Sequence, residues 1–400
     1  MKVYFKDESF AFEFVRNLGY AYYGGSDIGE LYATVENITE GDFDSWHDAW
    51  LARGERVAAR AKDHLEKGHI VSAREALLRA STYYRVGEFY LHGNPDDPRI
   101  LEEAKTSADL YSKAAELMGP TWEKVEIPYE GTTVPGYFYK ADESDEPRPT
   151  LLFHGGFDSS VEELYYFAAA GAIRRGYNCL TWDGPGQGLP VREQKLYFRP
   201  DWEAVVSPAV DYVLSRPDVD PERIALKGMS LGGYLAARAA AFEPRIKATI
   251  LFDGVWSLYD SIVKIMGDDA AKALENEDAD KFNELAQKLM DSNSQMRWTF
   301  DQGTWSFGQK TPYDFMVECK KMTLDGGIPE KIKSPTLVMK ADGDQFFKGQ
   351  PEKVYEALTN APKTFVAFHE EDGAENHCQS GALAFKDEVV FNWLDDTFKA

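Results

Sequence analysis

The sequence carries one serine in the setting that hydrolases use for a nucleophile. The segment Gly228–Gly232 reads Gly-Met-Ser-Leu-Gly and places Ser230 at its centre. Such a match alone is a weak signal, but here the strand-like run Arg223–Lys227 precedes it and a helical pattern rich in small residues follows. In this context the glycines permit a sharp turn that holds the serine oxygen above the end of the strand. We therefore predict that Ser230 is a nucleophile rather than an ordinary turn residue.

A serine hydroxyl attacks a carbonyl only when an adjacent base removes its proton. His369 and His377 are the two histidines near the last strand-like run, Thr364–Phe368. His369 directly follows that run, so the pleat of the strand would fix its direction. His377 lies in the polar loop beyond it, which is long enough to return over the edge of the sheet. We therefore predict His377 as the base.

An acid must orient the imidazole and stabilise its protonated form. The chain order in this kind of site is serine, acid, histidine, and Asp342 and Asp344 both follow the strand-like run that precedes the histidine strand. Turn geometry favours Asp344, with Asp342 as the alternative. Asp253 ends an earlier strand-like run and is a third candidate, although an ordinary Asp-Gly turn explains it better.

The attacked carbonyl oxygen becomes negatively charged and needs backbone N–H donors aimed at it in advance. Leu231, the residue after the nucleophile, is expected to supply one donor. The loop His154–Asp158 contains two consecutive glycines after the first parallel strand, and Gly156 or Phe157 would supply the other donor. Two glycines after a strand otherwise indicate an ordinary turn, and the serine motif downstream favours the oxyanion role.

Two further patterns are less specific. The glycine-rich segment Trp182–Gly188 lacks the Lys-Ser/Thr ending of a phosphate-binding loop and opens no clear helix, so we interpret it as a rigid turn near the rim of the pocket. Trp298, Trp305 and Tyr313 are candidates for substrate contacts, and packing within their own segment is an equally good interpretation. Cysteine and histidine do not cluster at metal-ligand spacing, so we expect neither a metal nor another cofactor.

Strands and helices alternate in the part of the chain that must position these residues. Apolar runs separated by helical patterns predict an α/β fold with a doubly wound, mostly parallel sheet, preceded by a hairpin around Glu130–Thr132. The segment between the fourth and fifth parallel strands is too long for a simple crossover, which predicts a helical cap insertion at 255–333. The runs are Thr150–Phe153, Asn178–Trp182, Arg223–Lys227, Ala248–Phe252, Pro335–Lys340 and Thr364–Phe368.

The first 120 residues show helical periodicity instead. Apolar residues recur at helical spacing from Asp44 to Leu65, again from Ile70 onwards, and from Pro98 to Met118, before the helix-stop pair Gly119-Pro120. The pattern is similar to a tetratricopeptide hairpin, but no second copy follows at a fixed period, so we expect no repeat array. We predict a helical N-terminal lid domain at 1–120 and a catalytic core at 121–400.

Composition excludes several classes of partner. The 400-residue chain has 44 Lys and Arg against 67 Asp and Glu, a formal charge of −23, which disfavours nucleic acid and anionic membrane surfaces. Three cysteines cannot form a disulfide framework and fit a reducing compartment. The first eight residues lack the apolar core of a secretion signal, and no apolar stretch is long enough to span a bilayer. We expect a cytoplasmic protein without membrane or nucleic-acid partners.

The motifs together resemble the α/β-hydrolase superfamily, and within it the branch with a helical N-terminal domain. That branch includes 2,6-dihydroxypseudooxynicotine hydrolase, the fermentation-respiration-switch-type esterases and the fungal Ayg1p-like hydrolases that shorten polyketides. The resemblance covers most of the chain and implies a triad of Ser230, an aspartate of the 342–344 turn and His377. It rests on Val71–Ala80, His154–Ser159, Trp182–Gly188, Gly228–Gly233 and Asp372–Gln379.

The resemblance implies a serine hydrolase that acts on a small aromatic or acyl molecule. The first hypothesis is cleavage of a C–C bond next to a ketone, of the retro-Claisen type, in an aromatic or polyketide-like β-diketone through an acyl-serine. The alternative is a carboxylester or thioester hydrolase that uses the same residues. A third hypothesis, a binding protein without activity, is disfavoured because the catalytic residues are complete and in order. The family also implies a possible homodimer formed through the N-terminal domain.

Overall fold

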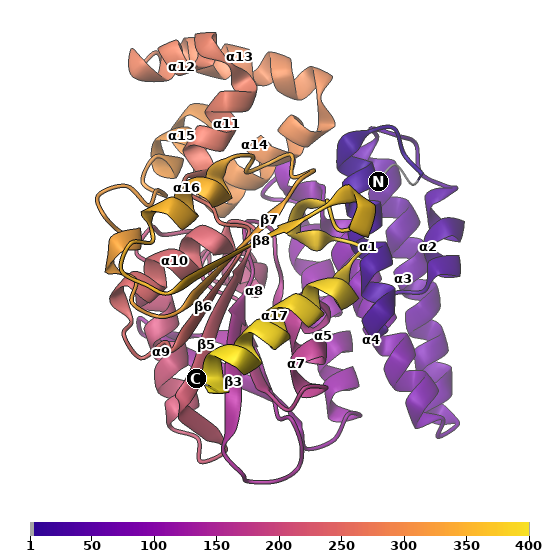
Figure 1. Cartoon of the computed structure of the whole chain (residues 1–400). Coiled ribbons are helices and arrows are strands. Elements are labelled where there is room, and N and C mark those ends of the chain that lie inside the picture. The colour runs from indigo at the N-terminus through magenta and orange to yellow at the C-terminus, as the bar shows by residue number, and fades with distance from the viewer. Residues whose placement is uncertain (1–3, 400) are drawn as a thin grey trace.

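An eight-stranded sheet lies at the centre of the molecule in the computed structural model, which describes residues 4–399 (Figure 1). Its strand order is β1-β2-β4-β3-β5-β6-β7-β8. β2 pairs antiparallel with β1 and β4, and the strands from β4 to β8 run parallel. The predicted hairpin and mostly parallel sheet are confirmed. The strands are β1 (Trp122–Tyr129), β2 (Thr132–Tyr139), β3 (Arg148–His154), β4 (Asn178–Trp182), β5 (Val219–Met229), β6 (Ala248–Phe252), β7 (Thr336–Ala341) and β8 (Lys363–Phe368).

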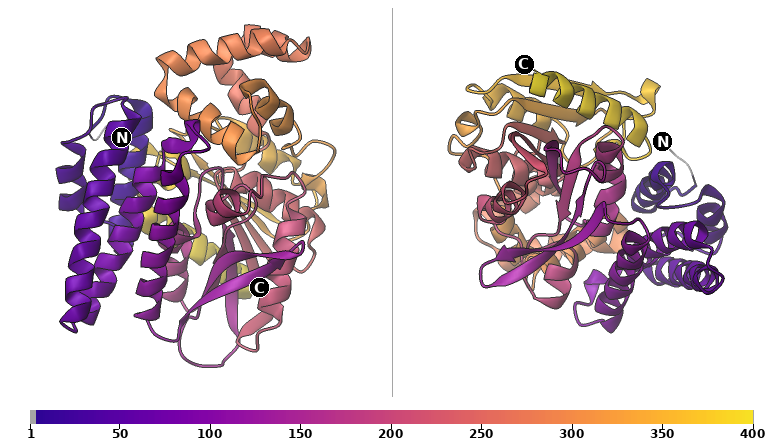
Figure 2. Two further views of the ribbon diagram at one scale, coloured as in Figure 1. Left: turned by 180° about the vertical axis from the view of Figure 1, so that it is seen from behind. Right: turned by 90° about the horizontal axis from the view of Figure 1, so that it is seen from below.

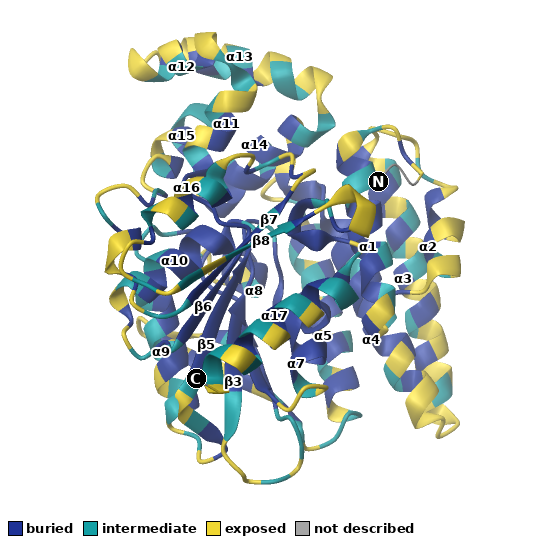
Figure 3. Cartoon of the chain, viewed as in Figure 1, coloured by how far each residue is buried: buried dark blue, intermediate teal, exposed yellow. Residues whose placement is uncertain are grey.

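Helices cover both faces of the sheet, because the inner strands are apolar on both sides. Every residue of β4 and β6 is buried, and the sheet forms the dark interior in Figure 3. α9 and α10 pack on one face, while α17 crosses the other (Figure 2). These helices are α9 (Glu203–Leu214), α10 (Gly232–Phe242) and α17 (Leu383–Lys399); a further helix, α16 (Gln350–Ala357), lies between β7 and β8 along the chain.

The helix after β3 is interrupted by a π-helical turn, Tyr165–Ala169, between the short helices α6 (Val161–Leu164) and α7 (Ala170–Ile173). The carbonyl of Phe167 accepts hydrogen bonds from the buried side-chain nitrogens of Lys227 and Lys386. A carbonyl engaged by side chains in this way interrupts the regular helical hydrogen bonds. The local sequence gives no sign of this, because both lysines come from distant elements.

The N-terminal region is helical, as predicted, and stands beside the sheet rather than over it (Figure 2). Two helices, α1 and α2, precede those that periodicity indicated. Asp7 caps α1 by accepting a hydrogen bond from the backbone N–H of Phe10, and the fully buried Phe10 and Phe14 hold that helix against its neighbours. The helices are α1 (Glu8–Tyr20), α2 (Ile28–Val35), α3 (Phe43–Glu66), α4 (Ile70–Glu88) and α5 (Pro98–Glu116). Residues 1–3 of the predicted N-terminal domain and Ala400 lie outside the described residues.

Five helices follow β6 and lie above the carboxyl ends of the strands, within the segment predicted to form a cap (Figure 1). Their inner members pack down towards the sheet, while α12 and α13 are largely exposed at the top (Figure 3). The helices are α11 (Leu258–Met266), α12 (Asp268–Glu275), α13 (Ala279–Ser292), α14 (Ser294–Ser306) and α15 (Pro312–Cys319).

A short helix, α8 (Gly188–Glu193), begins at the last glycine of the Trp182–Gly188 segment. The sequence analysis found no helix there, because six residues are too few to show a helical period. None of the helices within residues 4–399 combines the length and the apolar character needed to cross a bilayer.

Candidate active site

Ser230 lies on a sharp turn between β5 and α10. Its backbone is left-handed, with φ of 60°, a conformation that costs energy for a residue other than glycine. The turn requires its flanking glycines: a Cβ on Gly228 would lie 1.9 Å from the carbonyl oxygen of Gly232, and a Cβ on Gly232 would lie 2.6 Å from that of Gly155. The Ser230 N–H donates to the carbonyl of Phe252 at 2.9 Å, which ties the turn to β6. This geometry holds the hydroxyl at the carboxyl edge of the sheet.

Ser230, His377 and Asp344 come together at this edge. His377 Nε2 lies 2.9 Å from Ser230 Oγ, and His377 Nδ1 lies 2.9 Å from Asp344 Oδ2. Asp344 is itself held, because its Oδ1 accepts hydrogen bonds from the backbone N–H groups of Phe346 and Phe347. Burial alone would lower the pKa of His377, but Asp344, Cys378 and Asp253 together outweigh burial and the pKa lies well above the usual value. The alignment is the one that lets a histidine activate a serine.

A second buried carboxylate lies against the same imidazole. Asp253 Oδ2 is 2.9 Å from His377 Nδ1, and the Asp253 side chain is completely buried. Its Oδ2 also accepts from the Cys378 backbone N–H at 3.2 Å. Asp344 accepts the directed hydrogen bond, so Asp253 adds charge beside the ring. The sequence analysis favoured an ordinary turn at Asp253. The position of Asp253 at the end of β6, next to the strand that carries Ser230, could have indicated its contact with the site.

Asp342, the alternative acid, lies away from this cluster. Its Oδ2 is 2.6 Å from Nδ1 of His369, and both side chains are more than two-fifths exposed. The two residues therefore form a surface pair that does not reach Ser230.

The loop after β3 lies directly against the serine turn. A Cβ on Gly156 would lie 3.0 Å from the backbone nitrogen of Leu231, so the two predicted sources of oxyanion donors are adjacent. The Gly156 N–H already donates to Ser159 Oγ at 2.9 Å. Among residues 4–399, the backbone N–H of Phe157 makes no hydrogen bond, so of the two candidates in this loop Phe157 has the N–H that is free to meet an oxygen.

Gln187, which the sequence analysis did not single out, supports this loop from behind. Its Nε2 donates to the carbonyls of Gly155 and Gly156, both at 2.9 Å, while its Oε1 accepts from the Gly184 N–H. The Trp182–Gly188 segment thus supports the loop after β3 through hydrogen bonds. None of its residues lines the cavity that opens in front of Ser230.

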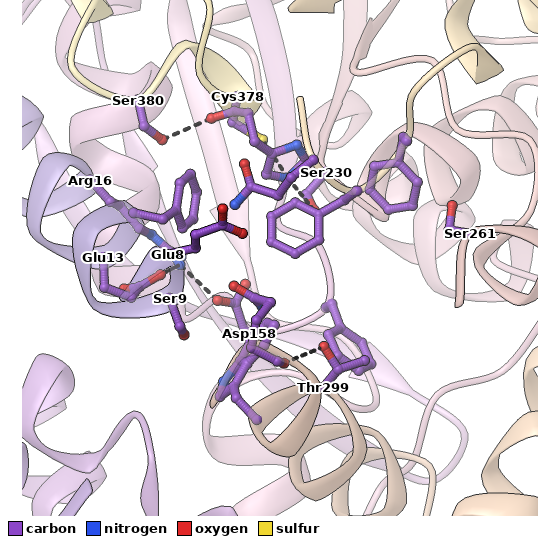
Figure 4. Close-up of a pocket in the computed structure, with 18 of the residues that line it drawn as sticks. Glu8, Ser9, Glu13, Arg16, Asp158, Ser230, Ser261, Thr299, Cys378 and Ser380 are labelled. Carbon is purple, nitrogen blue, oxygen red and sulfur yellow. Dashed lines mark hydrogen bonds and ion pairs between the residues drawn. The ribbon is translucent and has the colours of Figure 1, made fainter. Parts of the chain in front are cut away.

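A cavity of about 230 Å³ opens in front of Ser230 (Figure 4). Its walls come from α1, α11 and α14 and from the loops after β3, β7 and β8, and they are mainly apolar. Trp298 lines it, as the sequence analysis proposed. Trp305 instead stacks on the ring of His92 with centroids 4.0 Å apart, and Tyr313 packs near Phe282; neither lines the cavity.

Within the described residues, one group could offer ligands to a metal ion: Asp253, His377 and Cys378, whose ligand atoms lie within 4.8 Å of one another. Two of these are the imidazole that Ser230 contacts and the carboxylate beside it. An ion held there would occupy the base that the serine needs.

Comparison with known proteins defines the family. A family model described as esterase FrsA-like matches residues 27–275. The chain belongs to the FrsA-like family. Hydrolase LUC6 from a Fusarium species is 40% identical over 409 residues, covering 98% of this chain and 97% of that protein. The 20-hydroxy-prefusarin hydrolase FUS2 from Gibberella moniliformis is 39% identical over 410 residues, with coverage of 98% and 97%.

The fold of this FrsA-like protein is also found among solved structures. The crystal structure of 2,6-dihydroxy-pseudo-oxynicotine hydrolase aligns with a TM-score of 0.75 over 95% of both chains, at 22% identity. The predicted α/β-hydrolase fold and the predicted branch are confirmed. The FrsA-like chain is an α/β-hydrolase enzyme.

In this FrsA-like enzyme the N-terminal helices contact the loop after β3 through buried charges. Arg16 on α1 lies 2.7 Å from Asp158 Oδ2 and 2.7 Å from Glu163 Oε1, and Asp158 directly follows Phe157. Arg85 on α4 contacts Glu163 at 3.1 Å. Breaking one partner of such a buried pair leaves an uncompensated charge, which is strongly destabilising. The network therefore couples the position of the helices to that of the loop after β3.

Proposed function

We propose that this α/β-hydrolase cleaves a C–C bond next to a ketone in an aromatic or polyketide-like β-diketone, with Ser230, His377 and Asp344 as its triad. The observation that carries the triad is the continuous contact from Asp344 through His377 to the Ser230 hydroxyl, each step at 2.9 Å. The substrate class rests on the family resemblance and on the mainly apolar cavity, whose aromatic walls suit a planar ketone.

The reaction begins when His377 Nε2 takes the proton of Ser230 and Oγ bonds to the ketone carbon. The carbonyl oxygen becomes an alkoxide that accepts hydrogen bonds from the backbone N–H groups of Leu231 and Phe157. When the carbonyl re-forms, the C–C bond breaks and its electron pair leaves as an enolate, which His377 protonates. The products of this half are an acyl-serine and a free ketone.

Water completes the cycle. His377 removes a proton from a water molecule, whose oxygen attacks the acyl-serine; the second tetrahedral intermediate collapses to a carboxylic acid and free Ser230. An enolate is a feasible leaving group only where a neighbouring carbonyl or phenol spreads its charge, which is why the proposal specifies a β-diketone or a related aromatic ketone. We further propose that the N-terminal helices and the helices inserted after β6 act together as a lid that excludes bulk water during the first half.

A carboxylester or thioester hydrolase is the second candidate, favoured by the description of the family model as an esterase. The same triad serves both reactions, so activity must separate them. The test compares kcat/KM for an aromatic β-diketone with that for an aryl ester of matched acyl group, with Ser230→Ala as the control for both. Turnover of the diketone that is lost in Ser230→Ala supports C–C cleavage; turnover of esters alone overturns it. Absence of labelling of the wild-type serine by a fluorophosphonate would overturn both candidates.

A further inference from the structure

One end of the cavity is acidic. Apart from His377, its charged wall residues are the carboxylates of Glu8, Glu13 and Asp158 and the guanidinium of Arg16. Figure 4 shows these side chains grouped together around the cavity with Ser230. Burial raises the pKa of Glu13, and Arg85 lies 3.9 Å from its second oxygen. The carboxylates of Glu8 and Asp158 against Arg16 still give this end a negative potential, which disfavours an anionic ligand.

Arg16 has no capacity left for a substrate anion. Its side chain is 5% exposed, and it contacts Glu13 at 3.0 Å, Asp158 at 2.7 Å and Glu163 at 2.7 Å. Its Nε donates in addition to the hydroxyl of Tyr20. A carboxylate on the substrate could bind Arg16 only by displacing a buried partner, which would then lie unpaired in the protein.

Asp158 is the polar group best placed to meet a substrate. Only its Oδ2 is held by Arg16; among the described residues its Oδ1 has no hydrogen-bond partner, and the side chain is 12% exposed. Burial raises its pKa, but Arg16 and Arg85 outweigh burial and the pKa lies below the usual value. The carboxylate is therefore ionised and can only accept hydrogen bonds. Because Asp158 follows Phe157, it lies close to the proposed position of the reacting carbonyl.

We propose that Asp158 is a substrate-binding residue that accepts a hydrogen bond from a hydroxyl group on the substrate, and that the acidic end of the cavity excludes substrates with a carboxylate at that position. A hydroxyl suits the site better than an ammonium group, because the surrounding walls are mainly apolar and removing a full charge from water costs more than removing a hydroxyl. The substrate class is thus a neutral hydroxylated ketone. This inference rests on the proposed function.

The test uses a series of otherwise identical aryl substrates that carry hydroxyl, methoxy, ammonium or carboxylate at the position that would face Asp158 when the carbonyl lies against Ser230. For the wild-type enzyme we expect kcat/KM for the hydroxyl compound to exceed that for the methoxy compound by about 10-fold to 100-fold, as for a hydrogen bond to a charged group. The carboxylate compound should be the poorest. An ammonium compound that exceeds the hydroxyl compound would overturn the choice of a neutral donor.

Asp158→Asn keeps the shape of the side chain and removes its charge. In this variant the hydroxyl-to-methoxy ratio should fall at least about fivefold, and the disadvantage of the carboxylate compound should shrink. Glu163→Gln is the matched control, since it also removes an Arg16 contact but does not line the cavity; its hydroxyl-to-methoxy ratio should match the wild type. An unchanged ratio in Asp158→Asn would overturn the proposal, as would an equal fall in Glu163→Gln.

The same series is measured as ketones and as esters, so the selectivity can be tested whichever bond the enzyme cleaves. If neither is turned over, the proposed function fails. The dissociation constants of the four compounds for Ser230→Ala then test the selectivity alone. The hydroxyl compound should bind most tightly, and equal binding of the hydroxyl and methoxy compounds would overturn the inference.

Discussion

Two carboxylates at one imidazole nitrogen make His377 the most informative place to perturb this enzyme. Asp344 and Asp253 each place an oxygen 2.9 Å from His377 Nδ1. In both cases a change to asparagine removes one negative charge and keeps the side-chain shape. The four proteins needed are the wild type, Asp253→Asn, Asp344→Asn and the double variant.

The size of the effect follows from the distance. A unit charge at 2.9 Å interacts with the imidazolium by about 6 kcal/mol at an effective dielectric constant of about 20, and by about 1.4 kcal/mol in bulk water. The smaller figure corresponds to about one pKa unit. The carboxylates raise the pKa of His377, and the base works only when neutral, so activity is lost as the pH falls through that pKa. Removing a carboxylate should therefore move the acid limb to lower pH.

For Asp253→Asn we expect the acid limb of kcat/KM to move down by at least about one pH unit. At the plateau kcat should fall by about tenfold or less, because Asp344 keeps the directed hydrogen bond that sets the tautomer. Asp344→Asn should have a lower kcat than Asp253→Asn. Its kcat should nevertheless fall by less than the roughly 10⁴-fold expected when a triad acid has no substitute. The double variant should reach that loss.

The assay is the pH profile of kcat/KM on an aryl ester or the β-diketone, with thermal unfolding to confirm that each variant is folded. Asp342→Asn is the matched control, since it alters the surface pair with His369 and should leave the profile unchanged. The reasoning is refuted if Asp344→Asn alone is as slow as the double variant, or if Asp253→Asn leaves the acid limb in place.

Three further predictions concern the support of the site. Gln187→Ala should lower kcat by about tenfold with little change in KM, because the loop with the proposed oxyanion donor loses two side-chain hydrogen bonds; an unchanged kcat would show that these hydrogen bonds are dispensable. Trp298→Phe should raise KM by about tenfold, whereas Trp305→Phe, outside the cavity, should leave KM unchanged; equal KM values would contradict the cavity assignment. Burial raises the pKa of Glu88, but Arg192 and His92 outweigh it and lower the pKa to about 2, so Glu88 should stabilise the fold by about 3 kcal/mol above pH 5 and lose this contribution as the pH falls towards 2. The difference in unfolding free energy between wild type and Glu88→Gln, measured by urea titration from pH 7 to 3, should shrink with falling pH.

The elements that local pattern specifies were predictable. The strands β3 to β8 are short apolar runs, and the turn at Ser230 is marked by Gly228 and Gly232, because any side chain there would collide with neighbouring backbone. Chain order then indicated a histidine after β8 and an acid after β7, since the ends of parallel strands share one edge of the sheet. The period of the N-terminal helices was equally visible, although α1 and α2 were missed.

What local pattern could not reveal depends on which elements become neighbours. Asp253 reaches His377 because β6 lies beside β5, and Asp342 does not because its side chain pairs with His369 at the surface. Arg16 contacts Asp158 across 142 positions of sequence, and no periodicity records that approach. Trp298 and Trp305 lie on the same side of α14, about two turns apart. Only Trp298 lines the cavity, whereas Trp305 packs on His92. Burial and charge pairing between distant segments are set when the layers pack, so these contacts exist only in the folded molecule.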